Sequence, residues 1–326
     1  MREVSLRIES WPLREVFRIS RAACTDITVV VVEISEGIFL GRGECRPYPR
    51  YGETPQGVAA EIEALIPLLK MGMERDELNT MLPPGAARNA IDCALWDLVA
   101  KRTGQSVWQL AGLPPPLPLT TAYTLSVDSP DNLAIAANKQ AWRPLLKLKL
   151  AGSEDLERVA AVRANAPNAR LIVDANEAWT MADYHRLAPE LARLGVELLE
   201  QPFPSDADQC LANLPKPLPI CADESCHASS SLNKLLGLYD TVNIKLDKTG
   251  GLTEALRMKA LAEGLGFKVM VGCMVATSLA MAPAMLLAQG STYVDIDGPL
   301  LLAKDRQPGL SYQGSQAYPP EAGLWG

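Results

Sequence analysis

The first 45 residues have the hydrophobic pattern of β-strands. Val4, Leu6 and Ile8 alternate with polar neighbours, and a run of β-branched side chains follows at residues 27–34. Farther on, apolar residues recur at helical spacing in two segments, 55–69 and 86–102. The N-terminal part of the chain is therefore expected to combine a small sheet with helices.

The pattern becomes regular after residues 112–118, a Gly- and Pro-rich segment that we interpret as a domain boundary. Short apolar strands then alternate with helix-length segments rich in Ala, Leu, Glu and Arg. The predicted strands are 119–124, 145–149, 171–174, 197–200, 219–223, 242–245, 268–272 and 293–297. Eight strands that alternate with helices are typical of an α/β barrel. A doubly wound open sheet is the alternative, but the sequence has no Gly-rich first turn to support it.

Composition narrows the class of protein. The chain has 326 residues, 48% of them hydrophobic and 21% charged, which is typical of a folded globular protein rather than a disordered one. The formal net charge is −7 and no cluster of Lys and Arg stands out, so we expect no nucleic-acid or membrane partner. The start of the chain lacks the layout of a signal peptide, and no apolar run reaches the roughly 18 residues of a membrane span. We therefore predict a cytoplasmic protein.

Charged residues close five successive predicted strands. They are Lys149, Asp174, Glu200, Asp223 and Lys245, separated by 25, 26, 23 and 22 residues, about one strand–helix unit each. A charge on a buried strand costs several kcal/mol unless something compensates for it. A single such residue is explained by a structural ion pair, but five at the same position indicate an active site. Barrel enzymes carry their chemistry at this carboxyl end of the strands.

The order of these residues around the barrel suggests their roles. Asp174, Glu200 and Asp223 come from strands three to five and form an oxygen-rich site that suits Mg²⁺ rather than zinc. Lys149 and Lys245 come from strands two and six, which lie opposite each other in a ring of eight.

Lys147 shares a face with Lys149, because side chains two apart on a strand point the same way. There it is placed to donate to the substrate and to lower the pKa of its neighbour by like-charge repulsion. A free lysine has a pKa of about 10.4, so a lysine base needs such a lowering.

Two amines that flank a metal-held substrate suit one type of reaction. A proton next to a carboxylate is weakly acidic, and its removal leaves an enediolate that a divalent cation can stabilise. One amine can remove the proton and the other can return a proton to the opposite face. The sequence therefore predicts a 1,1-proton transfer, which is a racemisation or an epimerisation.

Several motifs together resemble the enolase superfamily, specifically its muconate-lactonising subgroup. They are Lys-x-Lys, Val-Asp-Ala-Asn, Glu-Gln-Pro, Ala-Asp-Glu-Ser and Asn-Ile-Lys-x-x-Lys-x-Gly-Gly, with the helix Ala-Ala-Arg-Asn-Ala-Ile-Asp-Cys-Ala-Leu-Trp-Asp-Leu before them. The resemblance covers nearly the whole chain. It implies an α+β capping domain over 1–112, a modified (β/α)7β barrel over 113–298, and a tail over 299–326 that returns to the capping domain. It also implies one Mg²⁺ per subunit.

Within that subgroup, Asp295 and Asp297 in the motif Asp-Ile-Asp resemble the dipeptide epimerases, which implies an L-Ala-D/L-Glu substrate. Geometry supports this, because strand eight lies across the ring from strand four and hence opposite the metal. Two carboxylates there can hold an ammonium group roughly 7 Å from the chelated carboxylate, as an extended dipeptide requires. The alternative is that one Asp of the pair only caps the strand.

The same resemblance implies further substrate contacts. Thr124 and Cys273 are expected to touch the dipeptide backbone. An arginine from a capping loop is expected to bind the glutamate γ-carboxylate, with Arg21 as first choice and Arg18 or Arg50 as alternatives.

Other functions share these features of the sequence. N-succinylamino-acid racemase, o-succinylbenzoate synthase and muconate cycloisomerase use the same kind of site but need no ammonium-binding Asp pair. A Schiff-base aldolase would use a barrel lysine without a metal, and a binding protein could keep the pocket without turnover. The sequence leaves open the oligomeric state, with a homo-oligomer among the alternatives, and the pathway, for which peptidoglycan recycling is the leading hypothesis.

Overall fold

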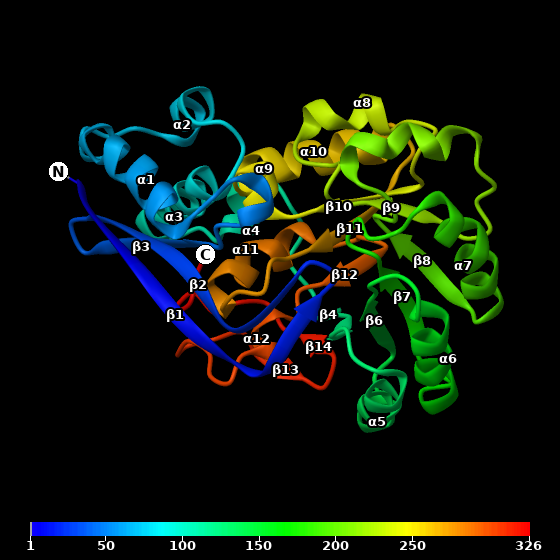
Figure 1. Cartoon of the computed structure of the whole chain (residues 1–326). Helices are drawn as coiled ribbons and strands as arrows, with labels where there is room; N and C mark the ends of the chain where they lie inside the picture. Colours follow the sequence, from blue (N-terminus) through cyan, green and yellow to red (C-terminus); the bar gives the residue numbers. More distant parts are fainter. Residues whose placement is uncertain (1) are drawn as a thin grey trace.

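The computed structural model describes residues 2–326, which fold into an N-terminal sheet-and-helix lobe beside a larger barrel (Figure 1). The N-terminal lobe begins with an antiparallel sheet in the order β1-β2-β3. Its strands are β1 (Arg2–Ile19), β2 (Ala22–Glu36) and β3 (Phe39–Cys45). The β-branched run in β2 is buried on both faces, because alternate side chains pack against the helices and against the core that includes the barrel. Only a two-residue turn separates β1 from β2, and it carries Arg21.

Two helices, α1 (Pro55–Lys70) and α3 (Ala86–Thr103), cover one face of this sheet. The shorter helices α2 (Arg75–Met81) and α4 (Val107–Leu110) pack against α3, and a 3-10 turn at Pro49–Tyr51 precedes all four. The two predicted helices are present as α1 and α3, and α2 and α4 are additions. Nearly every residue of α3 is buried, because one side packs on the sheet and the other meets the barrel through α9 and α10.

Gly43 lets α3 approach β3 closely. A Cβ atom at this position would overlap the carbonyl oxygen of Ala90 and lie 2.8 Å from the Ala94 nitrogen. We expect Gly43→Ala to lower the free energy of unfolding by about 1–3 kcal/mol, because both atoms belong to backbone that cannot move without shifting the helix. Urea denaturation followed by circular dichroism measures the change.

A matched control for this variant is Gly264→Ala at the end of α10 (Leu252–Gly264), where a new Cβ would meet no atom within 4 Å. This change should leave stability the same or raise it by up to about 1 kcal/mol. An equal decrease in the free energy of unfolding in both variants would contradict the close-packing argument.

The barrel consists of eight parallel strands in sequential order. They are β5 (Tyr123–Leu125), β6 (Leu145–Lys149), β7 (Arg170–Asp174), β8 (Val196–Glu200), β9 (Ile220–Ala222), β10 (Thr241–Ile244), β11 (Lys268–Gly272) and β12 (Tyr293–Asp295). The Ala122 amide donates to the Val294 carbonyl over 2.8 Å and joins the two ends of the sheet. The predicted α/β barrel is therefore confirmed, and the doubly wound alternative is excluded.

The first predicted barrel strand needs a correction. Residues 119–124 do not form one strand. Instead, β4 (Leu119–Thr120) pairs with β14 (Gln316–Ala317), which pairs with β13 (Tyr312–Gln313), and only β5 enters the barrel. Both β4 and β5 are at least partly buried, so the apolar pattern continues from one to the other. Periodicity alone therefore cannot locate the point at which one strand ends and the next begins.

Helices and turns surround the strands. The helices are α5 (Pro130–Gln140), α6 (Asp155–Asn165), α7 (Met181–Arg193), α8 (Leu232–Leu235), α9 (Leu246–Thr249), α10, α11 (Ser278–Leu287) and α12 (Gly298–Leu301). Two 3-10 segments, Ser205–Asn213 and Ser229–Ser231, lie in the connections after β8 and β9. All ten residues of α11 are buried, and this helix contacts β3 of the N-terminal lobe as well as β11.

An apolar layer fills the barrel below the charged strand ends. Leu145, Ile172, Leu198 and Cys221 pack together inside the ring with three further residues, Ala122, Met270 and Tyr293. The first four of these residues lie on β6 and on the next three strands, β7 to β9. Two residues after each of them, and also four residues after the one on β6, the inward-facing position carries a charged residue predicted from the sequence. The interior of the barrel is thus apolar below and charged at the carboxyl ends of the strands.

The tail of the chain reaches the N-terminal lobe. The Trp325 indole donates to the Cys93 carbonyl in α3 over 3.0 Å, and the Gly326 amide donates to Asp97 over 2.8 Å. Trp325 is fully buried there. Within residues 2–326, no helix combines the length and the apolar character needed to cross a membrane.

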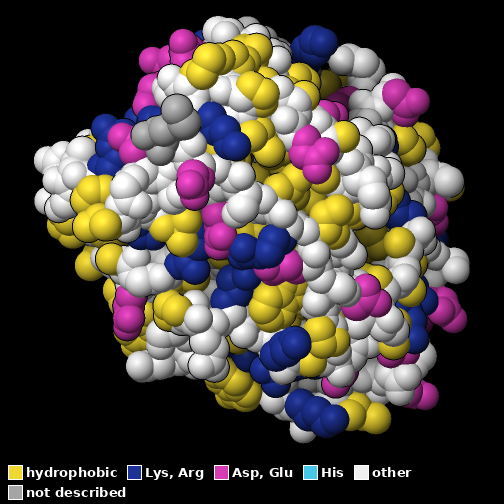
Figure 2. Space-filling model, turned by 90° about the vertical axis from the view of Figure 1, so that its left-hand side faces the viewer, with side chains coloured by type: hydrophobic (Ala, Val, Ile, Leu, Met, Phe, Trp, Pro, Cys, Tyr) yellow, Lys and Arg dark blue, Asp and Glu magenta, His cyan; other side chains and the backbone are white. Residues whose placement is uncertain are grey.

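One face of the N-terminal lobe shows mixed charges. Carboxylates lie among the basic side chains in Figure 2. The sheet of this lobe also carries ion pairs, such as Arg7 on β1 with Glu33 on β2, 2.8 Å apart.

Candidate active site

Three carboxylates meet at the mouth of the barrel. Asp174 and Glu200 are the last residues of β7 and β8, and Asp223 directly follows β9. One oxygen atom from each of the three lies within 4.8 Å of the others, and all three side chains are buried. Because parallel strands end at one edge, residues far apart in the sequence meet here.

This donor set fits a hard divalent cation. Two oxygens bound to one such ion at about 2.0–2.6 Å are at most about 5 Å apart, which the three carboxylates satisfy. Burial and the negative charge of Asp174 raise the pKa of Glu200 to about 7. Positive charge at the centre of the three would relieve this repulsion.

Two lysines flank the carboxylates from opposite strands. Lys149 at the end of β6 places its Nζ 2.6 Å from Asp174, and Lys245, directly after β10, places its Nζ 2.6 Å from Asp223. Four steps around the ring of eight separate β6 from β10, so the two strands lie on opposite walls. Burial alone lowers the pKa of Lys245, but the charge of Asp223 outweighs it and holds this pKa well above its ordinary value.

Lys147 lies deeper than Lys149. Its side chain is 1% exposed, and its Nζ is 2.7 Å from Glu200 and 2.8 Å from Asp295. Burial lowers the pKa of Lys147, but the charges of Asp295 and Glu200 outweigh this and raise it well above the ordinary value. In the structure, Lys147 therefore bridges the metal-type site and strand β12, and donation to a substrate stays a prediction.

A cavity of about 710 Å³, part of it open to solvent, lies between the barrel mouth and the N-terminal lobe. Lys149, Lys245 and Asp223 line it from the barrel. Residues at the end of β1, in the turn between β1 and β2 and in the segment after β3 cover it from the other side, among them Phe17, Ile19, Arg21, Tyr48 and Tyr51.

Asp295 and Asp297 line the same cavity. Asp295 ends β12 and pairs with Lys147, whereas Asp297 lies beyond the strand and accepts a hydrogen bond from the Thr124 amide over 2.6 Å. Burial and the charge of Asp295 raise the pKa of Asp297 to about 7. Thr124 and Cys273 also line the cavity, so the structure brings the predicted substrate contacts together.

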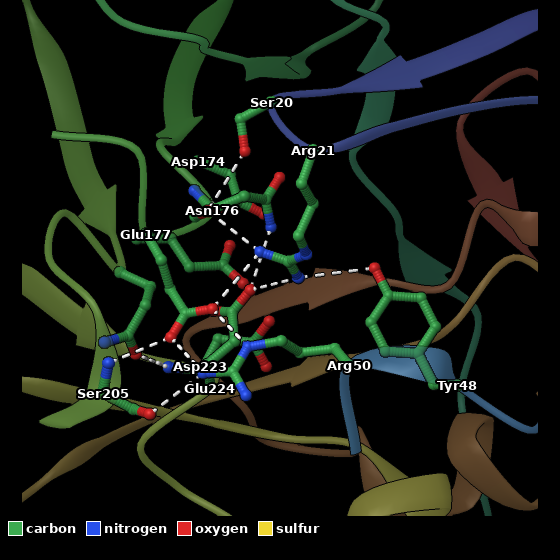
Figure 3. Close-up of polar contacts among 12 residues, drawn as sticks. Ser20, Arg21, Tyr48, Arg50, Asp174, Asn176, Glu177, Ser205, Asp223 and Glu224 are labelled. Carbon is green, nitrogen blue, oxygen red and sulfur yellow. Dashed lines mark hydrogen bonds and ion pairs between the residues drawn. The ribbon is translucent and has the colours of Figure 1, made fainter. Parts of the chain in front are cut away.

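The three candidate arginines differ in position. Arg21 lines the cavity and donates to Glu224 over 2.7 Å and to the Asn176 carbonyl over 2.9 Å (Figure 3). Arg50 makes two 2.7 Å hydrogen bonds with Glu177, and Arg18 lines a neighbouring cavity instead. Among these three, the geometry favours Arg21 as the substrate contact.

Comparisons with known proteins agree with this geometry. Residues 1–112 match the mandelate racemase/muconate lactonizing enzyme N-terminal domain, and residues 133–321 match the enolase C-terminal domain-like family. The chain belongs to the enolase superfamily.

Individual relatives are similar over nearly the full length. L-Ala-D/L-Glu epimerase from Escherichia coli is 48% identical over 96% of this chain and 98% of its own. N-acetyl-D-glutamate racemase from Pseudoalteromonas is 44% identical over 91% and 95%. The crystal structure of an Agrobacterium tumefaciens enolase family member with homology to dipeptide epimerases contains sodium and L-Ala-L-Glu. It is 51% identical with a TM-score of 0.98, and the match covers all of both chains.

Some polar residues of this enolase-superfamily site were not found from the sequence. Asn243 on β10 donates to Glu200 over 2.8 Å, and Lys248 donates to the Asp223 side chain over 2.5 Å. Asn243 precedes Lys245 by two residues and therefore faces the same way, which is the signal that could have found it. Glu224 and Asn176 follow metal-type ligands on loops, where no periodicity predicts direction.

Proposed function

We propose that this protein is a Mg²⁺-dependent dipeptide epimerase that inverts the α-carbon of the C-terminal residue, with L-Ala-D/L-Glu as substrate. One observation carries the proposal. Lys149 and Lys245 stand on opposite walls of the barrel, each 2.6 Å from a different carboxylate of one three-carboxylate cluster. Such symmetry suits the removal of a proton on one face and its return on the other.

Asp174, Glu200 and Asp223 would hold the Mg²⁺. When bound, it supplies positive charge that offsets the pull of the carboxylates on both amines and stabilises the negative charge that develops on the substrate carboxylate. The amines of Lys149 and Lys245 exchange a proton with the substrate α-carbon. Both side chains are mostly buried, which keeps water from competing for this proton.

The far end of the cavity would hold the rest of the dipeptide. Asp295 and Asp297 supply negative charge for the free ammonium group, and Thr124 and Cys273 lie beside the peptide backbone. Arg21 offers a guanidinium to an acidic side chain. The identity of 48% to L-Ala-D/L-Glu epimerase supports this assignment.

A dipeptide library incubated in D2O with Mg²⁺ tests the proposal. We expect dipeptides with an acidic C-terminal residue to gain one deuterium at the α-carbon, read by mass spectrometry, and to yield both epimers by chiral chromatography. Absence of exchange in every dipeptide would contradict the proposed function. Reduction with borohydride that traps a substrate on lysine without added metal would favour the aldolase alternative.

A second candidate is racemisation of an N-acylated amino acid, because N-acetyl-D-glutamate racemase is 44% identical to this chain. An N-acyl group carries no positive charge for Asp295 and Asp297. Comparison of kcat/KM for N-acetyl-glutamate and for L-Ala-L-Glu separates the two functions, and a higher value for the acylated substrate would favour racemisation.

The raised pKa of Asp297 predicts how binding depends on pH. Its pKa of about 7 means that the carboxyl group becomes protonated below that pH, and a neutral carboxyl group attracts an ammonium group much less. We expect KM for L-Ala-L-Glu to rise as pH falls from 8 to 6, with the midpoint near or below 7. In Asp297→Asn this dependence should flatten, and a KM that falls with falling pH would contradict it.

The cellular setting forms part of the same proposal. A cytoplasmic enzyme that acts on dipeptides released from murein would fit the proposed substrate, and assembly into a homo-oligomer is compatible with it. Size-exclusion chromatography with light scattering determines the assembly state directly.

A further inference from the structure

The turn between β1 and β2 is attached to the barrel by polar contacts from both of its residues. The Ser20 hydroxyl donates to the Asn176 carbonyl over 3.1 Å, and Arg21 Nη1 donates to the same oxygen over 2.9 Å. Figure 3 shows the Arg21 side chain extending from this turn to Asn176 and Glu224. Arg21 therefore depends on barrel residues for its direction.

Glu224 provides the charged contact to this arginine. Its side chain is 1% exposed, and its Oε1 accepts from Arg21 Nη2 over 2.7 Å and from Asn176 Nδ2 over 3.3 Å. Within the described residues 2–326, the other oxygen, Oε2, is buried without a hydrogen-bond partner. Glu224 also lines the cavity, where Arg21 and Asn176 are its neighbours. An anion is buried here at a cost that the arginine offsets.

Arg21 keeps donors free for a ligand. A guanidinium has five N–H groups, and the hydrogen bonds of Arg21 within the described chain use Nη1 and Nη2 but not Nε. A second carboxylate can therefore bind while Glu224 remains attached. In this arrangement Glu224 fixes the guanidinium, and the unused donor remains for the ligand.

A competing carboxylate lies nearby. Glu177 Oε2 is 3.4 Å from Arg21 Nη1, and Glu177 already binds Arg50 through two 2.7 Å hydrogen bonds (Figure 3). Without Glu224, the remaining carboxylate would draw Arg21 toward Glu177, away from its present position beside Glu224. Glu177 does not line the cavity, whereas Glu224 does.

We propose that Glu224 is a positioning residue that holds Arg21 toward the substrate side chain and so sets the preference for an acidic C-terminal residue. The proposal rests on the proposed function, because it names the group that determines its substrate class. Glu224 follows Asp223, but the three-carboxylate cluster is complete without it. Its role is thus exerted through Arg21 rather than through the cation.

A double-mutant cycle tests this role. The variants are Glu224→Ala, Arg21→Ala and the double variant, with Glu224→Gln added because its amide oxygen still accepts from Arg21. Calorimetry with Mg²⁺ present measures Kd for L-Ala-L-Glu and for its neutral isostere L-Ala-L-Gln. The ratio of these Kd values reports acid preference and needs no turnover.

We expect Glu224→Ala to reduce the preference for L-Ala-L-Glu by about tenfold or more, the effect of losing a charge-assisted contact. Glu224→Gln should reduce this preference by a smaller factor. In the Arg21→Ala background, removal of Glu224 should change the ratio no further. Glu63→Ala, on the exposed face of α1, is the matched control and should keep the wild-type ratio.

Three results would overturn the proposal. They are equal binding of both dipeptides by the wild type, an equal loss of binding for both in Glu224→Ala, and the same drop of the ratio in the presence and absence of Arg21. The second result would mean that Glu224 supports Asp223 rather than Arg21. Acid-selective binding without deuterium exchange would contradict the epimerase function while leaving the role of Glu224 intact.

Discussion

Replacing Lys149 or Lys245 with alanine is expected to abolish epimerisation, with kcat lowered by about 10²–10⁴-fold in each variant. Each amine faces the cavity from its own wall, so each variant loses the proton donor or acceptor on one face only. We therefore expect each variant to keep α-proton exchange with solvent for one epimer and to lose it for the other. Proton NMR in D2O with separate L,L and L,D dipeptides measures both quantities.

The control for this pair is Lys234→Ala, an exposed lysine on α8 that does not line the cavity, which should keep wild-type kcat. Normal turnover in both Lys149→Ala and Lys245→Ala would show that the two-base scheme is wrong. Loss of exchange from both epimers in one variant and neither in the other would assign both steps to a single amine.

Removal of the divalent cation is expected to produce a comparable loss. Chelation with EDTA should abolish exchange and added Mg²⁺ should restore it. Glu200→Gln should lower activity at fixed Mg²⁺ by at least about 10²-fold. Glutamine keeps the shape of Glu200 but removes one of three negative charges that lie within 4.8 Å of one another. Mg²⁺ titration of activity and of intrinsic fluorescence measures the weakened affinity.

Glu197→Gln provides the matched control because Glu197 lies on the same strand, β8, but pairs with Arg170 near the start of the strand, away from the three-carboxylate cluster at its end. A partly exposed ion pair of this kind contributes little to stability. Full activity of Glu200→Gln after exhaustive chelation would rule out the role of this carboxylate in holding a cation.

The residues at the strand ends could be predicted from the sequence because every strand–helix unit of the barrel follows the same local pattern. Each parallel strand ends at the same edge, so a charge at the end of an apolar run predicts both position and direction. Asp174, Glu200 and Lys245 follow this rule. Asp297 departs from it, because the last strand stops at Asp295 and the chain turns before reaching it.

Other parts of the site depend on contacts that no local pattern contains. The pairing of Arg21 with Glu224 joins residues 203 positions apart through a two-residue turn. Helix α2 is short and has one buried residue, Leu78, so its periodicity is too weak to be detected. The bridge from Lys147 on β6 to Asp295 on β12 likewise requires a closed ring, in which only β5 lies between these two strands.

The burial of Trp325 against α3 affects the order in which the protein can mature during translation. This helix lies near the start of the chain, yet its Cys93 carbonyl and Asp97 carboxylate bind groups at residues 325 and 326. A neighbouring face of the helix packs only once α10 has been made, because Thr253 of α10 donates to Asp92 over 2.5 Å. A ribosome that adds about 5–20 residues per second therefore releases the N-terminal lobe long before its last partners exist. The lobe reaches its final packing only after synthesis has passed Trp325.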